Sequence, residues 1–499
     1  MKPSSELFDL IQTLTPNEKG YFKKHCQRSG STSRKYIRLF DAIAAQKKYD
    51  ENAVRKKLKD PVLERNLSSE KNYLYHLILE ALLTSNSSGD PAYEMTRLLA
   101  KAKWLATHSF YEAAMRFIRK ILAWAEKNEL FVLHLEALDL EWLLWQYMPN
   151  DERRSIETIA EHRLNVMDRL AQTDRMRTLD IRVIRLFQET GIGREDSDLS
   201  KYREIFDESR RHAPEPGTLP VRARIFYYNI SVFYHNVSGK AEESLGDLQA
   251  LIRLMDANAL IKRERLSFYI SSLNNLILLL LHLGRYDEAK DMISSLGSAR
   301  PDTQSQRNTV FITLYNTRFD LYTYTRDWNA AAELSRKLKA ELPEFESLVD
   351  NRYTGHIRFA AFRSCYYCGE WKEALHWINQ LVQKTEGEPF KTELLTIARI
   401  CELIIHETLG NYDLLEKLAG SASRYLEKNH SLYQFETLML DYFRDCLKNP
   451  ADKTPLVTLQ SKLTEIGNDL LDKRVFMYFD FRAWAEARLK AGTIAEILG

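Results

Sequence analysis

The chain has 499 residues, of which 44% are hydrophobic and 28% are charged, and its formal net charge is +2. This balance excludes an intrinsically disordered chain, and five cysteines in a chain of this length exclude a disulfide framework. The longest apolar run, 276–281, is far shorter than the ~20 residues of a membrane-spanning helix, and the acidic start of the chain lacks a signal peptide's apolar run. We therefore expect a cytoplasmic protein, and the scarcity of glycine (18) and proline (13) favours helix nearly throughout.

The first 88 residues indicate a separate, mildly basic region of short helices. Thr15-Pro16-Asn17-Glu18 forms a capping box with proline at the first helical position, Asp60-Pro61 starts another helix similarly, and an apolar stripe predicts a helix over 68–83. The phrases LTPNEKGYFKKH and RKYIRLFDAIAAQKKYDENAVRKKL resemble the N-terminal region that precedes helical repeats in uncharacterised bacterial proteins, a resemblance that implies no activity. The stretch NSSGDPAY, near residue 90, is the clearest linker.

The positive charge of this region allows a nucleic-acid interpretation. Residues 1–85 carry a net charge of +6, and their basic side chains could contact phosphates. The alternative is an ordinary solvated face, which the packing pattern of the last helix favours. The side chains concerned are Lys56, Lys57, Lys59, Arg65 and Lys71.

Between residues 92 and 220 we expect helical pairs. The phrase HSFYEAAMRFIRKI, around Ala113, indicates a turn between two helices. Two less regular pairs should follow, the first with helices over 134–148 and 151–170 and the second with helices over 174–189 and 198–212.

The strongest signal is a phrase that recurs from residue 239 onward. It reads LGRYDEAKDMISSL around Ala289: a glycine that ends one helix, an aromatic residue that covers the turn, acidic residues at the start of the next helix, and a small residue where two helices cross. Copies occur at steps of roughly 41–45 residues, a period typical of a helical solenoid. They surround Ser244, Ala289, Ala331, Ala374 and Leu415.

This phrase resembles the tetratricopeptide repeat family, whose helix pairs have small residues at the crossing and Gly-aromatic at the turn. The resemblance covers roughly 220–420 and implies an all-α, right-handed superhelical solenoid. The period is several residues longer than the family's own, which leaves a related helical-hairpin repeat open. We expect helical repeats over 92–472, about eight or nine pairs, and one C-terminal capping helix over 473–499.

No catalytic, metal or cofactor motif is complete. Cys365-Tyr-Tyr-Cys368 has no second ligand pair and precedes Gly369 at a helix end, where the dipole disfavours thiolates, so we expect both cysteines to pack. His406-Glu407 lacks the second histidine of a zinc-protease helix. We therefore predict no enzyme activity, no metal and no cofactor.

Aligning the copies predicts one binding surface. Fifteen residues before Ser244, Ala289 and Ala331 stand three asparagines, all on the first helix of a pair and away from its apolar stripe. In the tetratricopeptide family this face lines the concave groove, and stacked amides could pair with an extended peptide. The alternative is that the asparagines bond neighbouring helices or face water. The predicted peptide-binding residues are Asn229, Asn274, Asn316, Phe233, Asn236, Asp320, Arg363 and Tyr366.

The sequence thus predicts a non-enzymatic scaffold that binds a protein or peptide on the concave face of its repeats. The alternative is a regulator whose basic N-terminal region binds nucleic acid while the repeats sense a ligand. No membrane partner is expected, and the sequence does not identify the protein partner.

Overall fold

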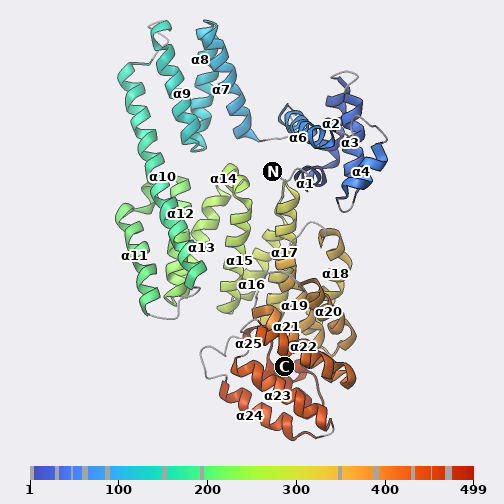
Figure 1. Ribbon diagram of the computed structural model, residues 1–499. Helices are drawn as coiled ribbons and strands as arrows, with labels where there is room; N and C mark the ends of the chain where they lie inside the picture. The colour runs from blue at the N-terminus through green and yellow to red at the C-terminus, as the bar shows by residue number, and fades with distance from the viewer. Residues whose placement is uncertain are drawn as a thin grey trace. The chain divides into compact units, whose positions relative to one another are not determined.

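The computed structural model describes twelve stretches of the chain, and within them it contains helices and turns but no strand (Figure 1). The chain divides into two compact units, Met1–Val166 and Met167–Gly499. No helix in the described part is long and apolar enough to cross a bilayer. The described residues are 5–28, 33–46, 49–58, 66–84, 90–148, 154–190, 196–346, 351–385, 393–428, 433–450, 452–466 and 475–499.

The described residues of the first unit begin with five helices around a shared apolar core. The predicted capping box is confirmed: Thr15 N–H donates to Glu18 Oε2 over 2.7 Å, and Glu18 N–H donates to Thr15 Oγ1 over 3.3 Å. The helix start predicted at residues 60–61 lies outside the described residues. The helices are α1 (Ser5–Thr13), α2 (Pro16–Arg28), α3 (Ser33–Ala44), α4 (Glu51–Leu58) and α6 (Leu67–Thr84).

Three helices follow in consecutive contact, α7 on α8 and α8 on α9. Both turns between them contain a left-handed residue, Ser109 at φ 65° and Glu129 at φ 54°. The phrase HSFYEAAMRFIRKI is centred on Ala113, but that residue is only half-buried. The fully buried alanine after this turn is the next residue, Ala114. The elements are α7 (Pro91–Thr107), α8 (Tyr111–Lys127), α9 (Phe131–Leu144) and the 3-10 turn η2 (Trp145–Tyr147).

The two helices predicted over 151–170 and 174–189 are one continuous helix, α10 (Ile156–Thr190), so that prediction is wrong. The reason is local, because no glycine or proline interrupts residues 156–190 and nothing stops the backbone hydrogen-bond ladder. The following helix, α11 (Asp196–His212), agrees with the predicted second member of the pair.

The rest of the second unit is a run of helices in which each packs on its neighbours (Figure 1). In addition, α15 contacts α17, α17 contacts α19, α19 contacts α21, and α21 contacts α23. The elements are η3 (Pro216–Thr218), α12 (Val221–Val237), α13 (Ala241–Asp256), α14 (Ala259–Glu264), α15 (Leu266–His282), α16 (Tyr286–Gly297), α17 (Gln304–Tyr324), α18 (Trp328–Glu346), α19 (Asn351–Tyr367), α20 (Trp371–Thr385), α21 (Glu393–Thr408), α22 (Tyr412–Lys428), α23 (Gln434–Lys448) and α24 (Thr454–Ile466).

The recurring phrase forms the same turn in every copy. The position that follows the first helix, Gly284 in the copy LGRYDEA, has a left-handed backbone in all five copies. Four of the copies have glycine there, where the absence of a Cβ removes the steric cost. The fifth copy has Arg326 at φ 56°. The residue five positions later is fully buried each time: Ser244, Ala289, Ala331, Ala374 and Leu415.

The C-terminal residues differ from the single helix predicted over 473–499. They form three short helices, α25 (Val475–Tyr478), α26 (Phe481–Lys490) and α27 (Ile494–Leu498). The break falls where Asp480 caps α26 by accepting from Ala483 N–H over 2.9 Å. These helices contact α19, α21 and α24, and several of their side chains lie in the same core as those helices.

Candidate functional site

Three of the predicted peptide-binding residues, all on α12, are engaged by the protein itself. Asn229 Nδ2 donates to Asp180 Oδ1 of α10 over 2.6 Å. The ring of Phe233 lies 5.3 Å from that of Phe187, also on α10. Asn236 accepts from Ser244 Oγ over 2.6 Å, across the turn that follows α12. For these three residues, contacts within the protein account for the side chains, and no bound peptide is needed to explain them.

Tyr366 is buried beneath the C-terminal segment, here defined as residues 475–499. Its hydroxyl is 2.7 Å from Thr408 Oγ1, and its ring lies 5.5 Å from that of Phe479. Phe479 is 1% exposed and also contacts the rings of Phe362 and Tyr367. The part of the predicted α19 face at Tyr366 is therefore covered by the C-terminal segment.

The other four predicted residues line one cavity of about 420 Å³. Asn274 belongs to α15, Asn316 and Asp320 to α17, and Arg363 to α19, which agrees with the contacts between those helices. The repeat alignment thus predicted a set of side chains that the fold brings together. The cavity is completed by Leu278, His356, Phe359, Ala360, Leu394 and Tyr478.

One end of this cavity is formed by Tyr478, the last residue of α25, and side chains of α19 bond to the backbone there. Arg363 Nη1 donates to the carbonyl of Tyr478 over 3.3 Å, and Arg363 Nη2 donates to Thr323 Oγ1 over 2.9 Å. The Tyr367 hydroxyl accepts from Asp480 N–H over 2.8 Å. Side chains of α19 thus satisfy the carbonyl of the last residue of α25 and a backbone N–H at the break between α25 and α26.

The polar groups of the cavity differ in how well they are satisfied. The side chains of Asn274, Asn316 and Asp320 form no hydrogen bond with any described residue. Burial raises the pKa of the Asp320 carboxyl, and the charge of Arg363 opposes that rise. Burial also lowers the pKa of His356, which favours its neutral form. The cavity therefore offers unused acceptors and amide donors to a bound molecule.

Sequence reasoning missed His356 and Tyr478 of the cavity and Asp180, the partner of Asn229. The alignment contained a signal for His356, because it occupies the position of Ser271 and Thr313 in the preceding copies. No sequence signal identifies Tyr478 or Asp180. They are 115 and 49 residues from the side chains that bond to them, and only the tertiary fold brings them close.

The cysteine pair behaves as packing, as predicted. Cys365 is buried with Sγ 3.1 Å from Ser335 Oγ, and Cys368 Sγ is 3.1 Å from the carbonyl of Trp328. Burial raises the pKa of the two thiols to about 12 and about 11, respectively. A nucleophilic or metal-binding cysteine needs the opposite shift.

One Ser-His-Asp cluster lies between α12 and α13, but it does not have the geometry of a hydrolytic triad. The Ser231 hydroxyl donates to Asp247 Oδ2, and His235 Nδ1 lies 2.8 Å from that same oxygen. In a triad the histidine lies between the other two residues and accepts the serine's proton. Among the described residues, no group of three or more metal-binding side chains is close enough to hold an ion.

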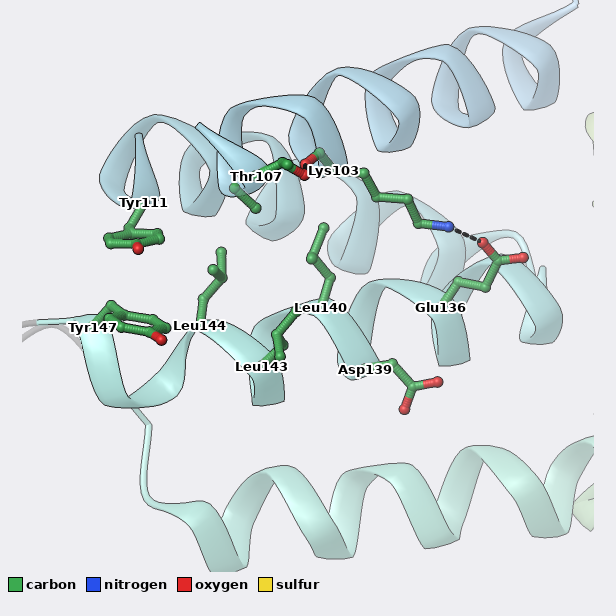
Figure 2. A pocket seen from close by; sticks show the side chains of 10 residues that line it. Lys103, Thr107, Tyr111, Glu136, Asp139, Leu140, Leu143, Leu144 and Tyr147 are labelled. Atoms are coloured by element: carbon green, nitrogen blue, oxygen red, sulfur yellow. Dashed lines mark hydrogen bonds and ion pairs between the residues drawn. The ribbon is translucent and has the colours of Figure 1, made fainter. Parts of the chain in front are cut away.

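A second cavity, of about 540 Å³, lies in the first unit between α7 and α9 (Figure 2). Lys103 on α7 pairs with Glu136 on α9 across it, with Nζ and Oε2 2.8 Å apart. Tyr111 stacks on Tyr147 at the other end, with ring centroids 4.4 Å apart. Its floor is aliphatic and its charges are already paired, so it shows no unused polar group comparable to Asp320.

The basic residues of the N-terminal region are only partly available. Lys71 is 3% exposed, and its ammonium donates to Glu51 and to the Tyr49 hydroxyl. Lys59 and Arg65 lie outside the described residues. Lys71 is thus an internal ion pair, and phosphate contact by the remaining lysines stays a prediction.

Comparison with known proteins adds no family assignment. No protein-family model matches the chain, and no curated protein matches it.

Proposed function

We propose that this protein is a non-enzymatic scaffold whose helices form a right-handed tetratricopeptide-like solenoid and whose α15–α17–α19 face binds a peptide or a peptide-like segment of another protein. The binding site is the cavity that contains Asn274, Asn316, Asp320 and Arg363. A cytoplasmic partner protein is the expected ligand.

The observation that carries this proposal is a set of polar side chains with unused hydrogen-bonding capacity in one cavity. Asn274 and Asn316 each offer a donor and an acceptor, which is the pairing that a peptide bond requires. Asn274, Asn316 and Asp320 are partly exposed at the cavity, so a ligand that enters it can reach all three side chains. The neighbouring capture of the Tyr478–Asp480 backbone by α19 supports the same chemistry.

The packing of successive first helices supports the solenoid interpretation. The contacts α15–α17, α17–α19, α19–α21 and α21–α23 repeat the same step, and each intervening turn has a left-handed residue followed five positions later by a buried residue, alanine in three turns and leucine in the fourth. A repeat array of this kind presents equivalent positions of successive helices side by side. This arrangement is what aligns Asn274 with Asn316.

The proposal is tested by selecting binding peptides from a random phage-displayed library against the purified full chain. Selected peptides are then measured by fluorescence anisotropy with the double variant Asn274→Ala, Asn316→Ala. We expect at least tenfold weaker binding, with no change in melting temperature. Asn275→Ala is the matched control, because this amide is exposed and does not line the cavity. Peptides that bind the double variant as tightly as the unmodified protein would place the site elsewhere.

A further inference from the structure

Among the polar groups of the cavity, the Asp320 carboxylate would gain most from a hydrogen-bond or ion-pair partner supplied by a ligand. No described residue donates a hydrogen bond to its carboxylate or forms an ion pair with it. Asp320 is only partly exposed, so its carboxylate has lost part of its hydration, and no donor from the described residues compensates that loss. The position therefore favours a ligand that brings hydrogen-bond donors.

The neighbouring side chains do not supply those donors. Arg363 directs Nη1 to the Tyr478 carbonyl and Nη2 to Thr323, and its Nε is buried without an acceptor. The lowered pKa of His356 favours its neutral form, which keeps one N–H donor, but this donor makes no hydrogen bond to Asp320. The Arg363 charge thus acts on Asp320 from a distance, while the hydrogen bonds of that guanidinium stabilise the cavity wall.

The rest of the cavity suits a long aliphatic stem. Leu278, Phe359 and Leu394 contribute apolar surface from α15, α19 and α21. Lysine and arginine pack their methylene groups on such surface while the charged head reaches a polar partner. The ring of Phe359 lies 6.2 Å from that of Tyr478, and aromatic faces add a further attraction for cations. A volume of about 420 Å³ is within the usual range of ligand pockets, about 300–1,000 Å³.

We propose that the cavity receives a basic side chain, lysine or arginine, of the bound peptide, with Asp320 as its counter-ion and the amide oxygens of Asn274 and Asn316 as further acceptors. This inference rests on the proposed peptide-binding function. An acidic side chain would meet the like charge of Asp320, while both terminal nitrogens of Arg363 already donate to the protein. A neutral side chain would leave the carboxylate's charge uncompensated.

Small probes test the subsite without a known partner. The full chain is titrated with n-butylguanidinium, n-butylammonium, pentanoate and pentanol by saturation-transfer difference NMR. We expect the two cations to bind at least tenfold more tightly than the other probes. Asp320→Asn should remove this preference, and Asp441→Asn, an exposed aspartate on α23, should leave it unchanged. A preference for pentanoate, or cation binding that Asp320→Asn does not weaken, overturns the proposal.

A second variant keeps the test decisive if Asp320→Asn fails to fold. Asn274→Asp adds a carboxylate to the same cavity, so it should tighten cation binding several-fold, and an unchanged or weaker affinity overturns the subsite. The peptides selected above separate this inference from the proposed function. If they bind through Asn274 and Asn316 but keep their affinity when every lysine and arginine is replaced by norleucine, the peptide site stands and the basic subsite falls.

Discussion

The pair Asp180 and Asn229 gives the sharpest test of whether the three aligned asparagines bind a ligand or stabilise the fold. Asp180 is 4% exposed, and its one described hydrogen bond comes from Asn229 over 2.6 Å. Burial raises the pKa of Asp180 from 3.8 to about 6, although the bond from Asn229 and the charge of Arg265 both act to lower it. Asn229 therefore stabilises a buried acid, whereas Asn274 and Asn316 line an open cavity.

The size of the effect follows from the two pKa values. A pKa of about 6 in the folded chain against 3.8 in the unfolded chain corresponds to about 3 kcal/mol, at about 1.36 kcal/mol per pH unit. Because the folded pKa is the higher one, folding favours the protonated acid. This contribution to the free energy of unfolding is complete below pH 3.8 and is lost as the pH rises through about 6.

Asp180→Asn removes the titrating group and is tested by urea unfolding followed by circular dichroism. Between about pH 4.5 and about pH 7.5, the unmodified protein should lose about 2 kcal/mol more of its unfolding free energy than the variant loses. Asp174→Asn, an exposed aspartate on the same helix, should retain the pH dependence of the unmodified protein. Parallel pH profiles for the unmodified protein and Asp180→Asn would refute the burial argument.

The same assay separates the three asparagines. Asn229→Ala should cost about 1–3 kcal/mol at neutral pH, because the ionised carboxylate loses its donor. Asn274→Ala and Asn316→Ala should each change stability by less than about 0.5 kcal/mol, since their amides bond to no described residue. Equal effects of all three substitutions would contradict this division into packing and binding residues.

Three further substitutions test the architecture. Phe479→Ala should cost about 3–5 kcal/mol in thermal denaturation and speed amide exchange in residues 475–499, because the ring is 1% exposed; exchange unchanged there would contradict its anchoring role. Glu407→Gln should cost about 3–5 kcal/mol by leaving Arg488 without its buried partner, and Glu407→Met with Arg488→Met should recover most of that loss; no recovery would locate the cost elsewhere. Ser109→Gly should raise stability by up to about 1 kcal/mol in urea unfolding, because glycine tolerates φ 65°, and a loss would show that the turn needs the serine.

The sequence predicted those features whose causes are local. The turn at Gly284 depends on a left-handed residue and on the small, buried Ala289 five positions later, and both can be recognised within one phrase. The alignment of the copies also grouped Asn274, Asn316, Asp320 and Arg363 as one site, and the fold places them in one cavity. A periodic signal works here because equivalent positions of successive helices are neighbours.

Features that depend on distant segments could not be predicted. The break at Asp480 follows from hydrogen bonds to α19, more than a hundred residues earlier, and a helical pattern alone favoured one continuous helix. Asn229 has the same place in the phrase as Asn274, yet only Asn229 is hydrogen-bonded to an acid on the adjacent helix. The recurring phrase predicts the position of an asparagine on its helix, but it does not predict which side chains of other helices lie opposite.

The faces of the successive first helices therefore have different roles. Side chains of α10 engage the predicted face of α12, and the C-terminal segment covers that of α19. On both, the polar groups have partners within the chain, so a ligand there would have to displace existing contacts. Between them, Asn274, Asn316 and Asp320 retain unused capacity, and a ligand would gain their hydrogen bonds without that loss. Specificity should therefore be concentrated on α15 and α17, and the Asp320 subsite should contribute more of it than any residue of α12.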